Sequence, residues 1–456
     1  MKLLHRPWNI FYLISISFFI SCSSEKEDTS EVITFNNGFT QNLILDWSTM
    51  WLEMDGAAAG MRPCASARSL AYIHLAAYET AIADMPNYIS NTTRLDGLSI
   101  EQNLRKSNVN LEVALNACYA KSLEFFVYNL PLTLFEKAKK LAKEKQQFFE
   151  TKLSKDIIEA SSQWGIYVAD QVITYSKTDL EASKQIPDPQ PTSYKPPIGE
   201  GNWTHNHEAE RALFPYWNKT RTFVITPEKT TSLPPMVYNE DINSDYYKEV
   251  KEVYDINNKA KEKQDEQLWI AEFWSDDVDF LMMSPPGRQI SIATQLIDQQ
   301  NLKYEESLAL LLKLSFSLND AAVSTWDDKY KYMTMRPNIY IKKSIDADYQ
   351  TNLFKLVFWP NPSFPSYPSG HSCFASAAAG VFINQFGDNI NFTDKTHENK
   401  TKFNGTPRKY TSLSEMAKEN AFSRIPLGVH MRMDCVEGLR LGYEISDAVN
   451  KMQLTP

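Results

Sequence analysis

Apolar residues recur at helical spacing along most of this chain, and residues 63–85 show the pattern most completely. In that stretch one helix face carries apolar and small residues three or four positions apart, namely Ala67, Leu70, Ala71, His74, Ala77, Tyr78, Ala81 and Ile82. We interpret His74, in the middle of this face, as a core histidine. The alternation and hairpin signals that mark strands are nearly absent from the sequence. The pattern therefore predicts an all-α fold.

Other stretches with the same spacing predict further helices, near 40–52, 111–128, 132–153, 157–175, 246–254, 264–273, 289–299, 304–326 and 431–452. The last of these contains Gly438 and Gly442 on one face. Because glycine has no side chain, these two positions would allow a neighbouring helix to approach closely.

A proline-rich region at 185–239 interrupts the pattern, and long ordered loops of this kind usually carry lids or binding surfaces. In this region His205 and His207, beside Glu208, could ligate a metal ion. The alternative is a solvated loop, because no third set of ligands accompanies them.

The charge of the chain limits its partners. A formal net charge of −9 over 456 residues argues against nucleic acid as the main partner. The length is sufficient for two or three average domains with a substantial core. A site for an anion in such a protein must therefore be a local cluster of basic residues.

The N-terminus has the organisation of an export signal. Lys2 and Arg6 precede an apolar run at 10–20 that is too short to span a bilayer. Ser21 before Cys22 resembles a bacterial lipoprotein cleavage site, which would make Cys22 the lipidated N-terminus. Ordinary cleavage nearby is the alternative. We expect an exported protein of the bacterial cell envelope, bound to a membrane through Cys22, in the outer membrane or the periplasm.

This interpretation divides the chain into three parts. We expect a signal peptide at 1–21, a solvated tether at 22–39 and one all-α domain at 40–456, whose functional motifs lie in the half at about 287–456. The remaining cysteines lie far apart and lack the Cys-x2-Cys spacing of metal sites: Cys64, Cys118, Cys373 and Cys435. Two disulfides could form among them, but we expect small buried thiols on helices.

The stretch Phe364-Pro365-Ser366-Tyr367-Pro368-Ser369-Gly370-His371 predicts the start of a helix rich in small residues. The backbone amides of Ser369, Gly370 and His371 would be unpaired donors in its first turn, and Gly370 has no Cβ to keep an anion away. Such a helix start is an anion cradle. An ordinary helix N-cap is the alternative interpretation of this stretch taken alone.

Basic residues and a second histidine flank that stretch. Upstream, Lys329 is followed by Arg336-Pro337; downstream, Ser423-Arg424 is followed by His430 and Asp434. Together the chain reads Lys-x6-Arg-Pro, Pro-Ser-Gly-His and Ser-Arg-x5-His-x3-Asp. Three cations and two imidazoles can converge on one anion, and each cation adds about 1.5–3 kcal/mol as a charge-assisted hydrogen bond.

This three-part pattern resembles the vanadium-dependent haloperoxidases and the type 2 phosphatidic acid phosphatase superfamily, which share one oxyanion site. The resemblance covers the C-terminal third and implies paired helical bundles. It implies that Lys329, Arg336, Arg424 and the Ser369 and Gly370 amides hold vanadate or phosphate, and that Asp434 assists. In a haloperoxidase His430 would be the only protein ligand of vanadium and His371 the acid–base group. In a phosphatase His430 would attack phosphorus and His371 would protonate the leaving group.

Three features favour the haloperoxidase over a periplasmic phosphatase. The chain lacks the membrane-spanning helices of the lipid phosphatases, it is much longer than the small acid phosphatases, and Trp326 precedes Lys329 as in the secreted bacterial haloperoxidases. We therefore expect vanadate as the cofactor, and hydrogen peroxide and halide as substrates, with a small organic acceptor as the potential target of the halogenating product. A lipoprotein with a degenerate binding site is a third interpretation, which the complete motif disfavours.

Phe364 is the residue on which our expectation for the halide rests. By resemblance, bromide-oxidising algal relatives have a histidine here, whereas chloride- and iodide-oxidising relatives have an aromatic residue. The open, phosphatase-like bacterial sites resemble the iodide-specific enzymes, so we expect iodide to be preferred, with Trp326 and Phe364 lining the halide pocket. Core packing of Phe364 is the alternative.

Carboxylates near the motifs also have two interpretations. Asp434 lies four residues after His430, where a helix would stack the carboxylate beside the imidazole and fix its tautomer. A surface pair at this spacing is the alternative. A second group follows Trp274 and either orients an active-site arginine or forms an acidic turn at a helix end: Asp276, Asp277 and Asp279.

Overall fold

The computed structural model describes residues 35–205, 207, 210–278, 280–355 and 361–456. Helices dominate the described chain, which confirms the predicted all-α class, and one short antiparallel hairpin joins them: α1 (Asn37–Asp55), α2 (Cys64–Ala81), α3 (Leu111–Phe126), α4 (Leu132–Glu150), α5 (Lys155–Lys177), α6 (Leu180–Gln185), α7 (Asp245–Lys263), α8 (Glu266–Phe273), α9 (Pro285–Gln300), α10 (Tyr304–Tyr332), α11 (Pro337–Ser344), α12 (Gly370–Phe386), β1 (Phe392–Asp394), β2 (Arg408–Tyr410), α13 (Leu413–Phe422), α14 (Arg424–Leu427) and α15 (Arg432–Asn450). None of these helices is long and apolar enough to cross a membrane.

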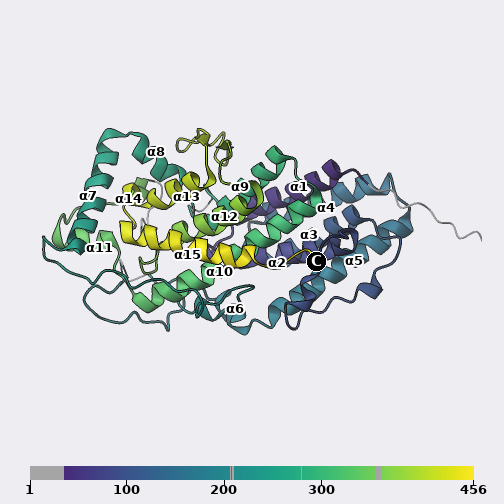
Figure 1. Ribbon diagram of the computed structural model, residues 1–456, viewed down its shortest axis with the longest axis horizontal. Helices are drawn as coiled ribbons and strands as arrows, with labels where there is room; N and C mark the ends of the chain where they lie inside the picture. The colour runs from purple at the N-terminus through teal and green to yellow at the C-terminus, as the bar shows by residue number, and fades with distance from the viewer. Residues whose placement is uncertain (1–34, 206, 208–209, 279, 356–360) are drawn as a thin grey trace, which may run out of the picture.

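The helices form an elongated molecule. Figure 1 shows α3, α4 and α5 gathered at one end and α7, α8 and α11 at the other, with α10, α12 and α15 between them. One hydrophobic cluster runs through this arrangement, from Leu43 on α1 to Leu454 beyond α15. His74 lies in this cluster with its Nδ1 atom 2.6 Å from Ser315 Oγ of α10, so its interpretation as a core histidine is confirmed.

Small residues bring α12 and α15 unusually close together. A Cβ at Gly442 would lie 2.3 Å from the Cys373 carbonyl oxygen, and a Cβ at Gly438 would lie 2.5 Å from the Ser369 carbonyl oxygen. Side chains at these two positions would therefore separate the helices. This contact places the start of α12 beside the start of α15, where the Ser369 amide donates to the Asp434 carbonyl at 2.9 Å.

The proline-rich region at 185–239 packs along α10, where two aspartate side chains accept hydrogen bonds from the loop. Asp320 of α10 accepts from the amides of residues 223–225, and Asp328 accepts from the Ser232 amide and the Thr231 hydroxyl. Both carboxylates are buried. Because buried carboxylates require hydrogen-bond donors, these two residues fix the loop against the C-terminal half of α10.

Candidate anion site

Lys329 lies in the last turn of α10, because this helix continues to Tyr332, beyond the end predicted at residue 326. Its side chain is fully buried. The Nζ atom donates to three carbonyl oxygens, those of Pro365 at 3.0 Å, Ser366 at 2.9 Å and Pro368 at 2.5 Å. One cation thus holds the backbone of residues 365–368, which lead into α12.

This arrangement bears on the role expected of Lys329. We expected its ammonium group to donate to the anion, but an ammonium has three hydrogens and all three are used here. Burial and the neighbouring Arg336 lower the pKa of Lys329 well below its usual value. An anion bound nearby would favour the charged form, so Lys329 can contribute its charge, whereas donating a hydrogen bond would require it to release a carbonyl.

Arg336 is the N-cap residue of α11 and is also fully buried. Its guanidinium group donates to the carbonyls of Phe364 at 3.0 Å and Val429 at 2.9 Å. Its Nη1 atom also lies 3.2 Å from His430 Nε2. Burial lowers the pKa of Arg336 to about 9, so the group remains charged at neutral pH.

His430 and Asp434 form a buried pair at the start of α15. The Nδ1 atom of His430 lies 3.0 Å from Asp434 Oδ2, which also accepts from the Met431 amide at 3.0 Å and the Ser366 hydroxyl at 2.5 Å. His430 precedes the helix, so helical stacking does not create the pair. Instead, Asp434 reaches back over the helix start as a capping residue, in the pattern of a capping box.

These contacts fix the protonation pattern of His430. A carboxylate oxygen accepts, so Nδ1 carries the proton; Nε2 faces a guanidinium donor and therefore keeps its lone pair. Burial, followed by the charges of Arg336 and Lys329, lowers the pKa of His430 well below its usual value. Burial raises the pKa of Asp434, and the Ser366 and Met431 hydrogen bonds oppose that rise.

The N-terminus of α12 supplies two of the three amide donors that were expected, those of Gly370 and His371. The Ser369 amide already donates to the Asp434 carbonyl at 2.9 Å, so it would have to release this acceptor before donating to an anion. The Ser369 hydroxyl accepts from the Ser372 amide at 3.3 Å, which leaves its own proton able to donate. The amides of Gly370 and His371 begin the helix and have no acceptor among the described residues.

His371 and Arg424 meet the segment that follows α8. His371 Nε2 lies 3.2 Å from the Ser275 carbonyl, and Arg424 Nη1 donates to the Trp274 carbonyl at 2.6 Å. Burial and Arg424 lower the pKa of His371 well below its usual value, and burial lowers the pKa of Arg424 to about 10. The Arg424 Nε–H is buried and lacks an acceptor among the described residues.

We call the buried side chains of Lys329, Arg336 and Arg424 the cation cluster. Mutual repulsion and desolvation make such a cluster costly, and a bound oxyanion would offset both. Free donors on Arg424, Gly370 and His371, together with the lone pair on His430 Nε2, fit a group with several oxygens and one nitrogen ligand. The described residues therefore fit vanadate, and they fit phosphate equally well.

The two predicted pocket aromatics lie against this cluster. The rings of Trp326 and Phe364 are 4.9 Å apart between centroids. Lys329 Nζ lies 5.1 Å and Arg336 Cζ 4.9 Å from the Phe364 centroid, within cation–π range. Trp326 Nε1 also donates to the Leu213 carbonyl of the proline-rich region at 3.2 Å. Phe364 therefore borders the site and also packs against Trp326.

Sequence analysis missed several residues that support the site. Ser366 lies in the motif stretch, but only the fold shows that its hydroxyl contacts Asp434. Arg288 on α9 had no sequence signal. It pairs with Asp276 at 3.1 Å, so the carboxylates after Trp274 do orient a buried arginine, although not a motif arginine. Asp277 is partly buried, and Asp279 lies outside the described residues.

Other candidates lie outside the site. No group of three His, Cys, Asp or Glu side chains that could hold a metal is present in the part of the chain that the structure describes; Glu208, beside His205 and His207, is outside that part. The predicted thiols of Cys64, Cys118, Cys373 and Cys435 are free and buried. Cys22 is outside the described residues.

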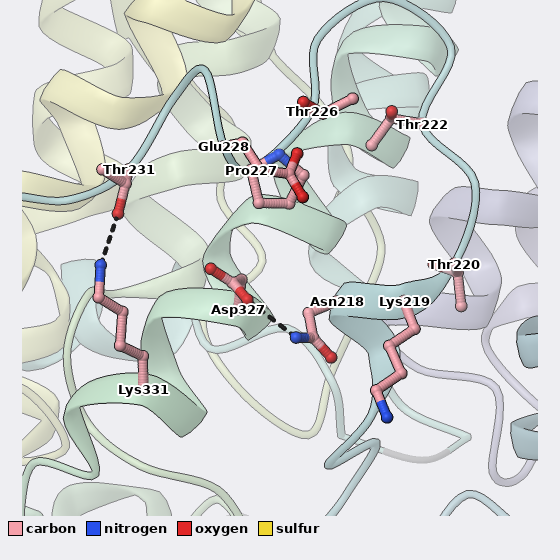
Figure 2. A pocket seen from close by; sticks show the side chains of 10 residues that line it. All are labelled: Asn218, Lys219, Thr220, Thr222, Thr226, Pro227, Glu228, Thr231, Asp327 and Lys331. Atoms are coloured by element: carbon pink, nitrogen blue, oxygen red, sulfur yellow. Dashed lines mark hydrogen bonds between the residues drawn. The ribbon is translucent and has the colours of Figure 1, made fainter.

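A polar surface pocket lies near the site but does not open into it. Figure 2 shows its lining, in which Asn218 donates to Asp327 at 2.8 Å and Lys331 to Thr231 at 3.1 Å. Asp327 and Lys331 are each two positions from Lys329, and residues two apart project from opposite sides of a helix. The pocket therefore lies on the outer side of α10.

Comparisons with known proteins agree with this fold. Residues 309–455 match the family model described as the VCPO second helical-bundle domain. A crystal structure described as the first bacterial vanadium-dependent iodoperoxidase superposes with a TM-score of 0.79 at 26% identity, over 93% of this chain and 99% of that one. The holo form of a bacterial vanadium-dependent chloroperoxidase gives 0.66 at 14% identity, over 87% and 94%. No curated protein sequence matches significantly.

Proposed function

We propose that this protein, whose fold and C-terminal bundle confirm its resemblance to the vanadium haloperoxidases, oxidises halide with hydrogen peroxide while holding vanadate. The observation that carries the proposal is the buried His430, whose Nε2 lone pair faces the cation cluster while Asp434 holds its Nδ1 proton. A neutral, oriented imidazole is the state that a metal ligand needs. Iodide is the halide we propose, with support from the iodoperoxidase similarity.

Each residue has a proposed role in that reaction. Vanadate, when bound, would supply Lewis-acid activation of peroxide without changing its own oxidation state. His430 Nε2 would be its protein ligand; Arg336, Arg424, Lys329 and the α12 amides would balance its negative charge. The Ser275 carbonyl keeps the proton of His371 on Nε2, so His371 Nδ1 can accept a proton from peroxide as it arrives and return it to a departing hydroxyl.

A paired assay tests this proposal against the phosphatase alternative. Purified protein is given peroxide and iodide after vanadate loading and, separately, a phosphate monoester without vanadate. We expect iodide oxidation that depends on vanadate, with little ester hydrolysis. Ester hydrolysis without halide oxidation would instead assign His430 as a nucleophile.

We also propose that the protein is exported and anchored through Cys22, on the support of the Ser21-Cys22 junction alone. Incorporation of a labelled fatty acid into the wild type, and its loss in Cys22→Ser, would agree with the proposal. A wild type that takes up no label would show that the protein is not anchored in this way.

A further inference from the structure

Two groups of the proposed site depend on a segment outside the C-terminal motifs. We call residues 273–277, which comprise the last residue of α8 and the turn after it, the strap. The Trp274 carbonyl accepts from Arg424 Nη1 at 2.6 Å, and the next carbonyl, that of Ser275, lies 3.2 Å from His371 Nε2. The position of one backbone segment therefore sets both an anion-binding cation and the proposed acid–base group.

The contact with Ser275 decides which tautomer His371 adopts. A carbonyl oxygen can only accept, so Nε2 must carry the proton and Nδ1 must keep its lone pair. If the Ser275 carbonyl moved away, this constraint would disappear and both tautomers would be accessible. The strap thus controls whether His371 presents an acceptor or a donor at Nδ1.

The strap does not hold this shape by backbone preference. Asp276 and Asp277 have φ values of 44° and 54°, in the left-handed region that non-glycine residues rarely adopt. Such backbone is strained and persists only when surrounding contacts impose it. Some other group must therefore hold the strap in place.

The Asp277 amide donates to the Met283 carbonyl and the Trp274 indole to Glu419, both at 2.9 Å, but Arg288 of α9 makes the most contacts with the strap. Its side chain is fully buried, and its guanidinium lies over the Phe273 and Trp274 rings, 4.7 Å from each centroid. Its Nε atom donates to Asp276 Oδ1 at 3.2 Å, and Nη2 donates to the Phe273 carbonyl. One side chain therefore contacts three residues of the strap, namely Phe273, Trp274 and Asp276.

The opposite edge of the guanidinium is anchored outside the strap. Nη1 lies 3.2 Å from Asp394 Oδ2 of β1, and Nη2 also contacts His397 in the turn that follows. Planar, forked recognition of several acceptors is specific to arginine; a lysine ammonium would retain the charge but could not reach all of them. Arg288 therefore clamps the strap to α9 and the β hairpin.

We propose that Arg288 is a positioning residue for the reaction, because it holds the strap so that the Ser275 carbonyl selects the tautomer of His371 and the Trp274 carbonyl aims Arg424. This proposal rests on the roles proposed above for His371 and Arg424. Arg288 itself contacts neither of them through any described hydrogen bond, so its effect must pass through the strap.

Arg288→Lys tests the proposal, with Arg68→Lys as a matched control. Arg68 is also buried, pairs with an aspartate (Asp179, 3.4 Å), donates to a backbone carbonyl (Ser176, 2.9 Å) and lies over a tyrosine ring (Tyr72, 4.6 Å), but it belongs to α2. Both variants lose the same planar fork. Only the variant at Arg288 loosens the strap.

The main readout is the tautomer of His371, measured by nitrogen NMR of the imidazole in vanadate-free protein and assigned with His371→Ala. We expect the wild type and Arg68→Lys to have the proton on Nε2, and Arg288→Lys to have a mixed population. Vanadate affinity should also fall about 10–100-fold in Arg288→Lys alone, as for other residues that orient ligands.

The outcomes separate this proposal from the proposed function. A wild-type tautomer and wild-type vanadate affinity in folded Arg288→Lys would overturn the positioning role. If Arg288→Lys does not fold, Asp394→Ala removes one acceptor of the guanidinium while keeping Arg288, and an unchanged tautomer there would overturn the proposal equally. A wild type that oxidises no halide would end the proposed function, yet the tautomer measurement would still test the strap.

Discussion

At the scale of residues, the site consists of imidazoles and buried cations that come from three separate segments of the chain. The motif side chains lie near one another, as the pattern of the motifs predicts: Lys329, Arg336, His371, Arg424 and His430. Their residue types alone indicate the chemistry of an anion site. The donor atoms depend on backbone geometry. The Ser369 amide and the Lys329 ammonium are already occupied by carbonyls, which no spacing of residues could reveal.

The contact between His430 and Asp434 forms as predicted, but for a different structural reason. The i,i+4 spacing suggested stacking along a helix, whereas α15 begins after His430 and the carboxylate caps its first turn. The pair forms in both cases, because a residue just before a helix and the residue in its first turn lie side by side. Helix boundaries are the part of a sequence prediction most easily displaced by one or two residues.

Halide preference is the prediction that belongs to one side chain, Phe364. We expect initial rates at equal peroxide to be high with iodide, weak with bromide and negligible with chloride. Phe364→His would place a proton-bearing ring beside Lys329 and Arg336 and should raise the bromide rate relative to iodide. Phe364→Leu, which keeps an apolar wall, serves as the control and should preserve the order.

Two results would count against that assignment. Wild-type bromide or chloride turnover equal to that of iodide would remove the preference. An unchanged halide profile in Phe364→His would show that this residue does not set it.

At the scale of elements, the contact between α12 and α15 positions the anion site. The sequence predicts that Gly442 permits close approach of a neighbour, and the 2.3 Å that would separate a Cβ at this position from the Cys373 carbonyl oxygen confirms that expectation. The strap after α8 could not be foreseen in this way, because its role resides in backbone carbonyls and in a distant arginine. Periodicity reports the buried face of a helix, but it does not report which loop covers the end of that helix.

Gly442→Ala tests the close contact. A methyl group there would meet a backbone oxygen at 2.3 Å, so the helices must separate, and we expect a loss of about 1–3 kcal/mol in the free energy of unfolding. Gly38→Ala on α1 is the control, because its nearest neighbour would be 3.5 Å away. Denaturant unfolding of both variants measures the difference. Equal stabilities would mean that α12 and α15 tolerate separation.

At the scale of the whole molecule, the all-α class follows from periodicity, whereas the way the bundles share one core does not. The largest hydrophobic cluster of the described residues joins helices that lie far apart in the sequence, such as α1 and α15. Periodicity identifies each apolar face but not its partner, which is why the bundle arrangement could be expected only from resemblance. The same core makes the protein sensitive to acid.

Stability should fall with pH because buried histidines are neutral in the folded protein. Burial lowers the pKa of His74 from 6.5 to about 3, so between these values the unfolded chain binds a proton that the folded chain does not. The free energy of unfolding therefore decreases as pH falls through this window, by about 1.4 kcal/mol per pH unit for each such histidine.

His74→Gln removes that one proton difference without touching the anion site. We expect its unfolding free energy to depend less steeply on pH than that of the wild type, by about 1.4 kcal/mol per unit between roughly pH 6 and pH 4. Denaturant midpoints measured across this range provide the comparison. Identical slopes would mean that His74 is protonated in the folded protein.

The central claim is that His430 anchors vanadate through Nε2, and the most direct measurement is vanadate-dependent iodide oxidation in His430→Ala beside the wild type. His430 Nε2 lies 3.2 Å from Arg336 of the cation cluster, whereas His371 is assigned to proton transfer, so activity should fall to the background seen without vanadate while the circular dichroism of the fold is preserved. Retention of more than a small fraction of the wild-type rate in folded His430→Ala would contradict the account.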